Sequence, residues 1–351
     1  MGAALAQGPV AVKQGAGATR HKLRAHRLQA AATLGPDLHG RGKAAKGGAM
    51  LSLLMRLSTA ITSILLLTSP GFAPIGARTV NAGTVAKPAL WVVRDADTTL
   101  YLFGTIHVLR PDVRWFHGPV KSAFDKSGTL VVEVVTPDTA SVAATTARLA
   151  IDPDGPPLSQ KLDGATRARY LTLLDRVGLP QAHLEPFYPW FAAVSLSIAP
   201  LEKLGYSPDS GVEEVLKKAA AQKNKPVVAL ESMDEQLGFF AGLPEAVQLR
   251  FLVATIADAE KAETEIARMV SEWSAGHPAA LADDMNDSLK DMPEIADTLL
   301  YQRNRHWAAW IEKRMEQPGT VFLAVGAGHL AGKGSVLEEL AARGLVARRV
   351  E

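Results

Sequence analysis

The sequence predicts an α/β fold, with a central sheet built from two strand-GxxH-loop-helix-strand units and a large helical insertion between them. Two observations lead to this prediction. An apolar, strand-like run ends twice in the same pattern, once at Gly104 to His107 and once at Gly326 to His329. Between the two patterns, residues 141–315 show mostly the apolar spacing of amphipathic helices. The repeated order of elements indicates an internal repeat of architecture, although little sequence is shared.

The first unit is expected to begin with a hairpin. Residues 90–94 and 99–103 are short β-branched and aromatic runs, and the polar residues 95–98 between them favour a turn. After the Gly-x-x-His pattern, residues 119–126 have helical character, and the run 129–135 is typical of a strongly apolar strand.

The second unit closes the chain in the same order, as strand 320–325, helix 335–343 and strand 345–350. The insertion between the units is interrupted by one strand at 226–231, which follows a helix at 211–222. Because parallel strands joined by a helix must cross over, each Gly-x-x-His is expected at the carboxyl edge of the sheet. That edge is where open α/β sheets bind ligands.

The first 77 residues are expected to lie outside the folded domain. Residues 1–49 are rich in Ala, Gly, Lys and Arg and read as a disordered or mis-assigned start, with translation beginning at Met50 or Met55. Residues 50–77 combine a short basic region, about a dozen apolar residues and a small-residue exit, which is the layout of a signal peptide. The apolar run is shorter than the ~20 residues of a membrane span. We therefore expect a periplasmic or secreted protein with its domain at 89–351 and no stable membrane span after signal removal.

The composition argues against nucleic acid as a partner and excludes cysteine chemistry. The chain has a formal net charge of +2, but residues 1–48 hold eight Lys or Arg against one acid, so the remainder is mildly acidic. Because the basic excess belongs to that tail, nucleic acid is not an expected partner. The sequence contains no Cys, which excludes a disulfide framework, a lipid-anchor cysteine and thiolate chemistry.

His107 and His329 are candidate catalytic and metal-binding residues. A single Gly-x-x-His is weak support in a chain with 29 Gly and 9 His, since a structural histidine in a loop also explains it. Two in equivalent contexts point to function, because neighbouring strand ends would bring both imidazoles to one place. The Gly that opens each turn lets the backbone bend sharply or approach a ligand.

Acidic residues extend the candidate site. Glu133 lies within an apolar run, where a carboxylate is costly to bury unless a metal, a cation or hydrogen bonds satisfy it. Its alternative is an edge-strand residue that faces water. Glu231 ends the strand 226–231 and is either a site residue or an N-cap or first-turn acid of the next helix. Glu213 ranks third, because an acid that opens a helix is also a favourable charge at its N-terminus.

Two imidazoles and two carboxylates without a thiol form an N/O ligand set that suits divalent Zn, Mn, Co or Fe. Such a metal would lower the pKa of a bound water from about 15.7 to about 7, which yields hydroxide at neutral pH. Serine-nucleophile chemistry fits less well, because the sequence has no Gly-x-Ser-x-Gly elbow.

A set of motifs covers nearly all of residues 90–351 in a familiar order: Ala89-Leu-Trp, Tyr101-Leu-Phe-Gly-Thr-Ile-His-Val-Leu109, Leu130-Val-Val-Glu-Val134, Gly211-Val-Glu213, Lys225-Pro-Val-Val-Ala-Leu-Glu231 with Gln236, Gly242-Leu-Pro244, Arg303-Asn304 with Trp307, and Val325-Gly-Ala-Gly-His-Leu330. In these motifs the sequence resembles the TraB/PrgY/GumN family, whose relatives include the Tiki metalloproteases. The resemblance implies an α/β core with a helical insertion and a metal-dependent hydrolase or peptidase. It assigns the paired histidines to His107 and His329 and the motif acids to Glu133 and Glu231. Where the family usually has Asp, this chain has Glu213.

Two functions follow as expectations. The first is a cell-envelope hydrolase, peptidase-like, in which a His/Glu-bound divalent metal activates water against a peptide or protein substrate. Arg303 would then steady an oxyanion and Asn304 would hold a ligand, the alternative for both being a salt bridge and cap on a long helix. The second is a non-catalytic envelope binding or accessory protein, which the resemblance to the GumN branch would link to surface polysaccharide production.

Overall fold

Six strands form one mixed sheet. The computed structural model describes residues 84–351, apart from the side chains of residues 284–289, so the segments 1–49 and 50–77 lie outside the described residues. The strands are β1 (Leu90–Arg94), β2 (Thr98–Thr105), β3 (Thr129–Val132), β4 (Val227–Ala229), β5 (Gly319–Gly326) and β6 (Arg348–Arg349). Their order across the sheet is β4-β3-β5-β2-β1-β6.

The two strands that end in Gly-x-x-His are direct neighbours. β2 and β5 pair in parallel, with Thr105 opposite Gly326 at their carboxyl ends. β3 and β4 continue the parallel part of the sheet beyond β5, whereas β1 pairs with β2 as the expected antiparallel hairpin and β6 pairs with β1. The end of β2 also touches the turn after β5, since a Cβ added to Gly104 would lie 3.0 Å from the Cα of Ala327. The predicted α/β fold is therefore confirmed.

Three predicted strands are shorter than expected. The run 129–135 ends as a strand at Val132, where the backbone bends at Glu133, and the run 226–231 ends at Ala229. Backbone pairing continues past both ends, because Glu231 N donates to Glu133 O over 2.9 Å. Both glutamates thus follow their strands rather than lie inside them, at the same edge of the sheet as the histidines. The last strand is reduced to two residues at the opposite end of the strand order.

Helices make up most of the remaining structure. They are α4 (Gly118–Lys126), α5 (Thr139–Ala150), α6 (Gly164–Val177), α7 (Pro189–Lys203), α8 (Val212–Gln222), α9 (Met233–Ala241), α10 (Glu245–Asp258), α11 (Ala262–Ala275), α12 (Pro278–Leu289), α13 (Pro293–Ala296), α14 (Gln302–Met315) and α15 (Val336–Ala342). Short 3-10 turns, η1 (Leu158–Lys161), η2 (Gln181–His183), η3 (Pro208–Ser210), η4 (Ala259–Lys261) and η6 (Ala327–Leu330), join them, and one π-helical turn, η5 (Asp297–Tyr301), precedes α14. The predicted insertion of helices between the two units is present.

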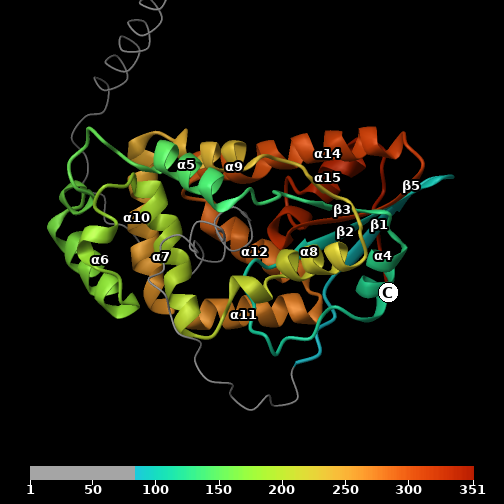
Figure 1. Ribbon diagram of the computed structural model, residues 1–351, viewed down its shortest axis with the longest axis horizontal. Coiled ribbons are helices and arrows are strands. Elements are labelled where there is room, and N and C mark those ends of the chain that lie inside the picture. The colour runs from blue at the N-terminus through green and yellow to red at the C-terminus, as the bar shows by residue number, and fades with distance from the viewer. Residues whose placement is uncertain (1–83) are drawn as a thin grey trace, which may run out of the picture. The chain divides into compact units, whose positions relative to one another are not determined.

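The sheet is covered on both faces. Alternate residues of the strands pack on α14 and α15 through side chains such as Trp307 and Leu340. The opposite face, which includes Phe103 and Phe322, packs on Phe124 of α4 and on the helices of the insertion. Figure 1 shows α14 and α15 on one side of the strands and α4 and α8 on the other.

Local sequence explains where several helices begin and end. Asp138 and Asp163 cap α5 and α6 by accepting hydrogen bonds from backbone N–H groups three residues on. Ser232 and Glu235 form a capping box at the start of α9. No single helix of the described part of the chain is long and apolar enough to cross a bilayer. One pair of helices bent by 93°, Met233–Ala241 with Glu245–Ala275, reaches that length and apolar composition only when the two are taken together.

Candidate functional site

Four neighbouring parallel strands deliver the four predicted ligands to one edge of the sheet. His107 follows β2, His329 follows β5, Glu133 follows β3 and Glu231 follows β4. All four are buried, with 4% of His107, none of Glu133 or His329 and 8% of Glu231 exposed. The alternative of a water-facing Glu133 is therefore wrong. The sequence-based expectation of a shared site at the carboxyl edge agrees with this geometry.

Arg303 lies at the centre of the cluster and binds both glutamates. Its Nε and Nη2 atoms donate to the two carboxylate oxygens of Glu231 over 2.9 Å each, and Nη2 also donates to Glu133 Oε2 over 2.8 Å. Only 1% of the side chain of Arg303 is exposed. Burial opposes its charge, but the two carboxylates outweigh that effect and raise the pKa of Arg303, so the guanidinium stays charged.

A π-helical turn positions Arg303. In η5 the backbone takes one extra residue per turn, and Gln302 N donates to Asp297 O five residues back. The carbonyl of Leu299 inside this turn accepts from Arg303 Nη1 over 3.2 Å. The ring of Trp307, one turn further on, lies 4.7 Å from Arg303 Cζ, and its Nε1 donates to Glu231 Oε1 over 2.9 Å. Helix α14 therefore supplies both the cation and the aromatic wall of the site.

Glu133 is held from three sides. Its Oε1 accepts from the backbone N–H of Gly326 over 2.6 Å, and Oε2 accepts from Gln236 Nε2 over 3.0 Å in addition to Arg303. Burial raises the pKa of Glu133, while the guanidinium of Arg303 opposes that shift. The Gly326 bond ties this carboxylate to the second Gly-x-x-His turn. The sequence predicts that a metal, a cation or hydrogen bonds satisfy a buried Glu133. Among the described residues, Arg303 is the cation, and Gly326 and Gln236 donate the hydrogen bonds.

Asn304 fixes the ring of His329. His329 Nδ1 lies 2.6 Å from Asn304 Oδ1, and Asn304 Nδ2 donates to Gly334 O over 2.6 Å. Because the amide NH₂ is used by Gly334, the amide oxygen must accept the hydrogen of Nδ1. Nε2 of His329 then accepts a hydrogen bond from Arg303 Nη1 over 3.3 Å. Asn304 thus orients the ring of His329.

Glu213 plays the same part for His107. Its Oε1 lies 2.7 Å from His107 Nδ1, at the distance of an ion pair although the alignment falls short of a regular hydrogen bond. Thr105 Oγ1 donates to the same oxygen. Nε2 of His107 is buried and has no hydrogen-bond partner in the part of the chain that the structure describes. Glu213 is therefore both a first-turn acid of α8 and the partner of a site histidine.

Gly211 permits this contact. A Cβ added at Gly211 would lie 2.1 Å from the carbonyl oxygen of His107, so no other residue fits between the loop and α8. The backbone N–H of Val212 then donates to Ile106 O over 3.0 Å, which seats the start of α8 on the histidine loop. The motif Gly-Val-Glu is thereby explained by close backbone approach, and only the tertiary structure reveals it.

The contribution of the His107–Glu213 pair to stability depends on pH. Burial disfavours the charge of His107, but Glu213 and, further away, Glu133 outweigh burial and raise its pKa above 6.5. Burial alone would raise the pKa of Glu213, yet His107 and Thr105 lower it below 4.5. The His107 contribution to stability is complete below pH 6.5 and is lost as pH rises through its raised pKa. The Glu213 contribution is complete above pH 4.5 and is lost as pH falls through its lowered pKa.

We therefore expect the stability difference between the wild type and Glu213→Gln to be greatest between pH 4.5 and 6.5. It should shrink at alkaline pH and again in strong acid. Urea unfolding across this range measures it, with Glu214→Gln as the control, because Glu214 is the neighbouring acid and pairs with Lys217 on the surface of α8. A difference that does not vary with pH would contradict the charged pair.

The comparisons with known proteins agree with this architecture. The chain belongs to the TraB/PrgY/gumN family, whose model matches residues 89–349. It is similar to the uncharacterized protein YbaP of Escherichia coli K12, with 25% identity over 254 residues that cover 72% of this chain and 92% of YbaP. The YbaP of Shigella flexneri matches to the same extent. The resemblance expected from the motifs is thus confirmed for nearly the whole of the described domain.

Proposed function

We propose that this protein is a metal-dependent hydrolase with peptidase-like activity. One observation carries the proposal: His107 and His329, from adjacent strand ends, each have Nδ1 beside a side-chain oxygen, that of Glu213 and that of Asn304. An imidazole whose other nitrogen is fixed by a carboxylate or amide is the usual form of a metal-ligating histidine. For His107 the available Nε2 is a buried nitrogen without a hydrogen-bond partner among the described residues.

The chemistry of these donors fits a divalent ion such as Zn, Mn or Co. His107 and His329 would supply nitrogen, and Glu133 and Glu231 would supply oxygen. In the described part of the chain no group of three or more His, Asp or Glu side chains is arranged as a ready cage. The reason is that both carboxylates turn toward Arg303. An ion at this edge of the sheet would therefore compete with Arg303 for Glu133.

A bound ion would supply a water of lowered pKa and polarise a substrate carbonyl. The residues of the chain have their own tasks. Glu213 and Asn304 hold the two imidazoles in one orientation. Arg303 fixes the orientation of the Glu231 carboxylate through a two-point contact. Burial of the whole cluster strengthens each of these interactions, because little water screens them.

We propose an exported location, periplasmic or secreted, for the same protein. The support is the sequence pattern of residues 50–77, together with the mildly acidic, cysteine-free remainder. A peptide or protein of the cell envelope is the corresponding substrate class.

A second candidate, a non-catalytic envelope binding or accessory protein, is favoured by a different observation. Arg303, Glu133 and His329 are closed off from solvent, and Arg303 satisfies both carboxylates without any ion. In that case the cluster serves only to hold four strand ends together. Metal content separates the two candidates.

The test is metal analysis of the full chain, purified without a histidine tag and dialysed against Mn²⁺, Co²⁺ or Zn²⁺. The hydrolase predicts about one tightly held ion per chain, and peptide-bond hydrolysis of an unfolded protein substrate that a chelator removes and the ion restores. Ligand histidines must lose their protons, so ion uptake should rise as pH increases through the raised pKa of His107. A chain that stays metal-free after supplementation at alkaline pH would favour the second candidate.

A further inference from the structure

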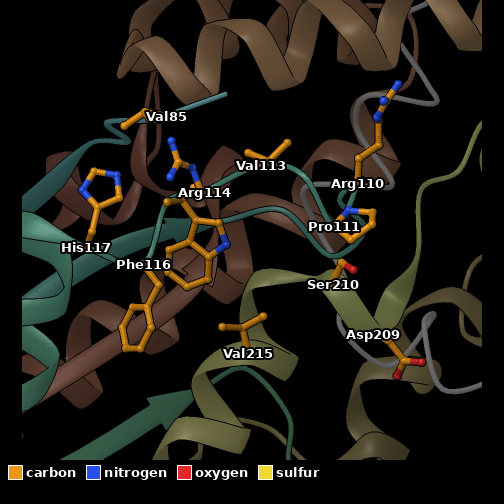
Figure 2. A pocket seen from close by; sticks show the side chains of 11 residues that line it. Val85, Arg110, Pro111, Val113, Arg114, Phe116, His117, Asp209, Ser210 and Val215 are labelled. Atoms are coloured by element: carbon orange, nitrogen blue, oxygen red, sulfur yellow. The ribbon is translucent and has the colours of Figure 1, made fainter. Parts of the chain in front are cut away.

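An open groove lies beside the loop that carries His107. It has a volume of about 600 Å³ and is lined by residues 110–111 and 113–117 of that loop, by Val85, and by Asp209, Ser210 and Val215. We call it the Arg114 groove. Figure 2 shows Arg114 and His117 near Val85 at one end, and Arg110, Asp209 and Ser210 at the other. A volume of this size is typical of a ligand site.

Positive charge at one end of the groove is unmatched. Arg114 is exposed and makes no ion pair or side-chain hydrogen bond within the described residues. The Nε2 atom of His117 is buried and also lacks a hydrogen-bond partner there. Arg110 differs, since its Nε lies 3.2 Å from Asp112 Oδ1. The Arg114 end therefore offers one unpaired guanidinium to an anionic group, whereas Arg110 already pairs with Asp112.

The middle of the groove is apolar and fixed. Val113 and Val215 lie between the two ends, on opposite sides of the groove, in Figure 2. Trp115 also lines the groove and is 3% exposed. Its ring stacks on that of Phe103 of β2 with centroids 5.6 Å apart, and its centroid lies 5.3 Å from that of Phe116. Because these rings belong to the core, the wall exists before any ligand arrives and costs little ordering on binding.

The groove shares its walls with the candidate site. Ser210 and Val215 flank Glu213 on η3 and the first turn of α8. The loop that carries His107 is bonded to the same segment, because Leu109 N donates to Ser207 O over 3.3 Å and Ser207 N donates to Leu109 O over 2.9 Å. A ligand in the groove would touch the two chain segments that hold the His107–Glu213 pair.

We propose that the Arg114 groove binds an acidic peptide segment. A carboxylate would meet Arg114, a neighbouring apolar side chain would lie against Val113 and Val215, and Asp209 and Ser210 would accept backbone N–H groups. Asp209 disfavours a polyanion, and the apolar middle disfavours a bare inorganic ion. That this peptide is also a substrate rests on the proposed hydrolase, whereas its binding to the groove does not.

The test is fluorescence anisotropy with a fluorescein-labelled hexapeptide that contains two glutamates and two leucines. Binding is measured on the full chain with His107→Ala, so that neither turnover nor a metal enters the result. We expect Arg114→Gln in that background to weaken binding about tenfold, because it removes one charge-assisted contact. Arg94→Gln, an exposed arginine at the end of β1, is the matched control and should change nothing.

A counterpart peptide with lysines in place of the glutamates should bind at least about tenfold more weakly. Equal binding of both peptides, an unchanged affinity in Arg114→Gln, or full competition by millimolar inorganic phosphate would each overturn the proposal. Failure of the hydrolase is seen separately, in the metal content and turnover of the wild type. A chain that binds the acidic peptide but holds no metal would support the groove and refute the hydrolase.

Discussion

Replacing Arg303 with Met is expected to lower the free energy of unfolding by about 3–5 kcal/mol, the typical cost of removing one partner from a buried ion pair. Arg303 satisfies two carboxylates that are almost wholly buried, Glu133 and Glu231. Methionine has a similar length but leaves both acids without their cation. Chemical denaturation of the two proteins at neutral pH measures the difference.

Arg305→Met is the matched control on the same helix. Arg305 pairs with Asp297 at 3.3 Å, but about half of each side chain is exposed, so the change should stay within about 1 kcal/mol. Adding Glu133→Gln and Glu231→Gln to Arg303→Met should recover part of the loss, because no charge then stays buried without a partner. An Arg303→Met protein as stable as the control would refute Arg303 as the cation that balances this site.

The same variant also tests competition with a metal. If Glu133 is a metal ligand, Mn²⁺ or Zn²⁺ should raise the Tm of Arg303→Met more than that of the wild type, since the ion replaces the missing cation. Equal shifts in both proteins would indicate that any ion binds elsewhere.

His107→Ala and His329→Ala are each expected to reduce metal binding and hydrolysis to background while the fold persists. Both histidines follow strand ends, and the ring of His329 also packs on Trp307 with centroids 4.3 Å apart, so a thermal melt must accompany each variant. Glu213→Gln should have a smaller effect, about 10–100-fold in metal affinity or activity, because it removes only the group that orients His107. Metal analysis, turnover and thermal melts on the same preparations provide the three readouts.

His277→Ala is the matched control, because His277 also pairs with a glutamate, Glu272 at 2.8 Å, but 64% of its side chain is exposed. It should keep both metal and activity. Loss of stability without any change in bound metal, in His107→Ala or His329→Ala, would favour the non-catalytic candidate instead.

Much of the site was predictable from local sequence. Apolar runs followed by Gly-x-x-His mark strand ends, and a strand-helix-strand order imposes a crossover that sends those ends to the same edge. The prediction that His107 and His329 emerge side by side followed from these two facts, and the pairing of Thr105 with Gly326 confirms it. Glu133 was singled out because an acid in an apolar run requires a partner.

The partners themselves were not predictable, because they are distant in the chain. Arg303 lies 72 residues from Glu231 and 170 from Glu133, and Thr105 lies 108 from Glu213. Local propensity and spacing carry no information about such contacts. Two strands also end earlier than predicted, at Val132 and Ala229. The contacts of Glu133 with Arg303 and Gly326 follow no periodic pattern in the sequence.

The sequence by itself therefore determined the shared edge of the strands and the identity of the side chains that gather there. Only the tertiary structure decided what those side chains contact: a buried guanidinium between two carboxylates, and a fixed tautomer for His329. The physical reason is that hydrophobic periodicity and turn residues act within a few positions, whereas the compensation of a buried charge depends on whichever segment packing brings against it.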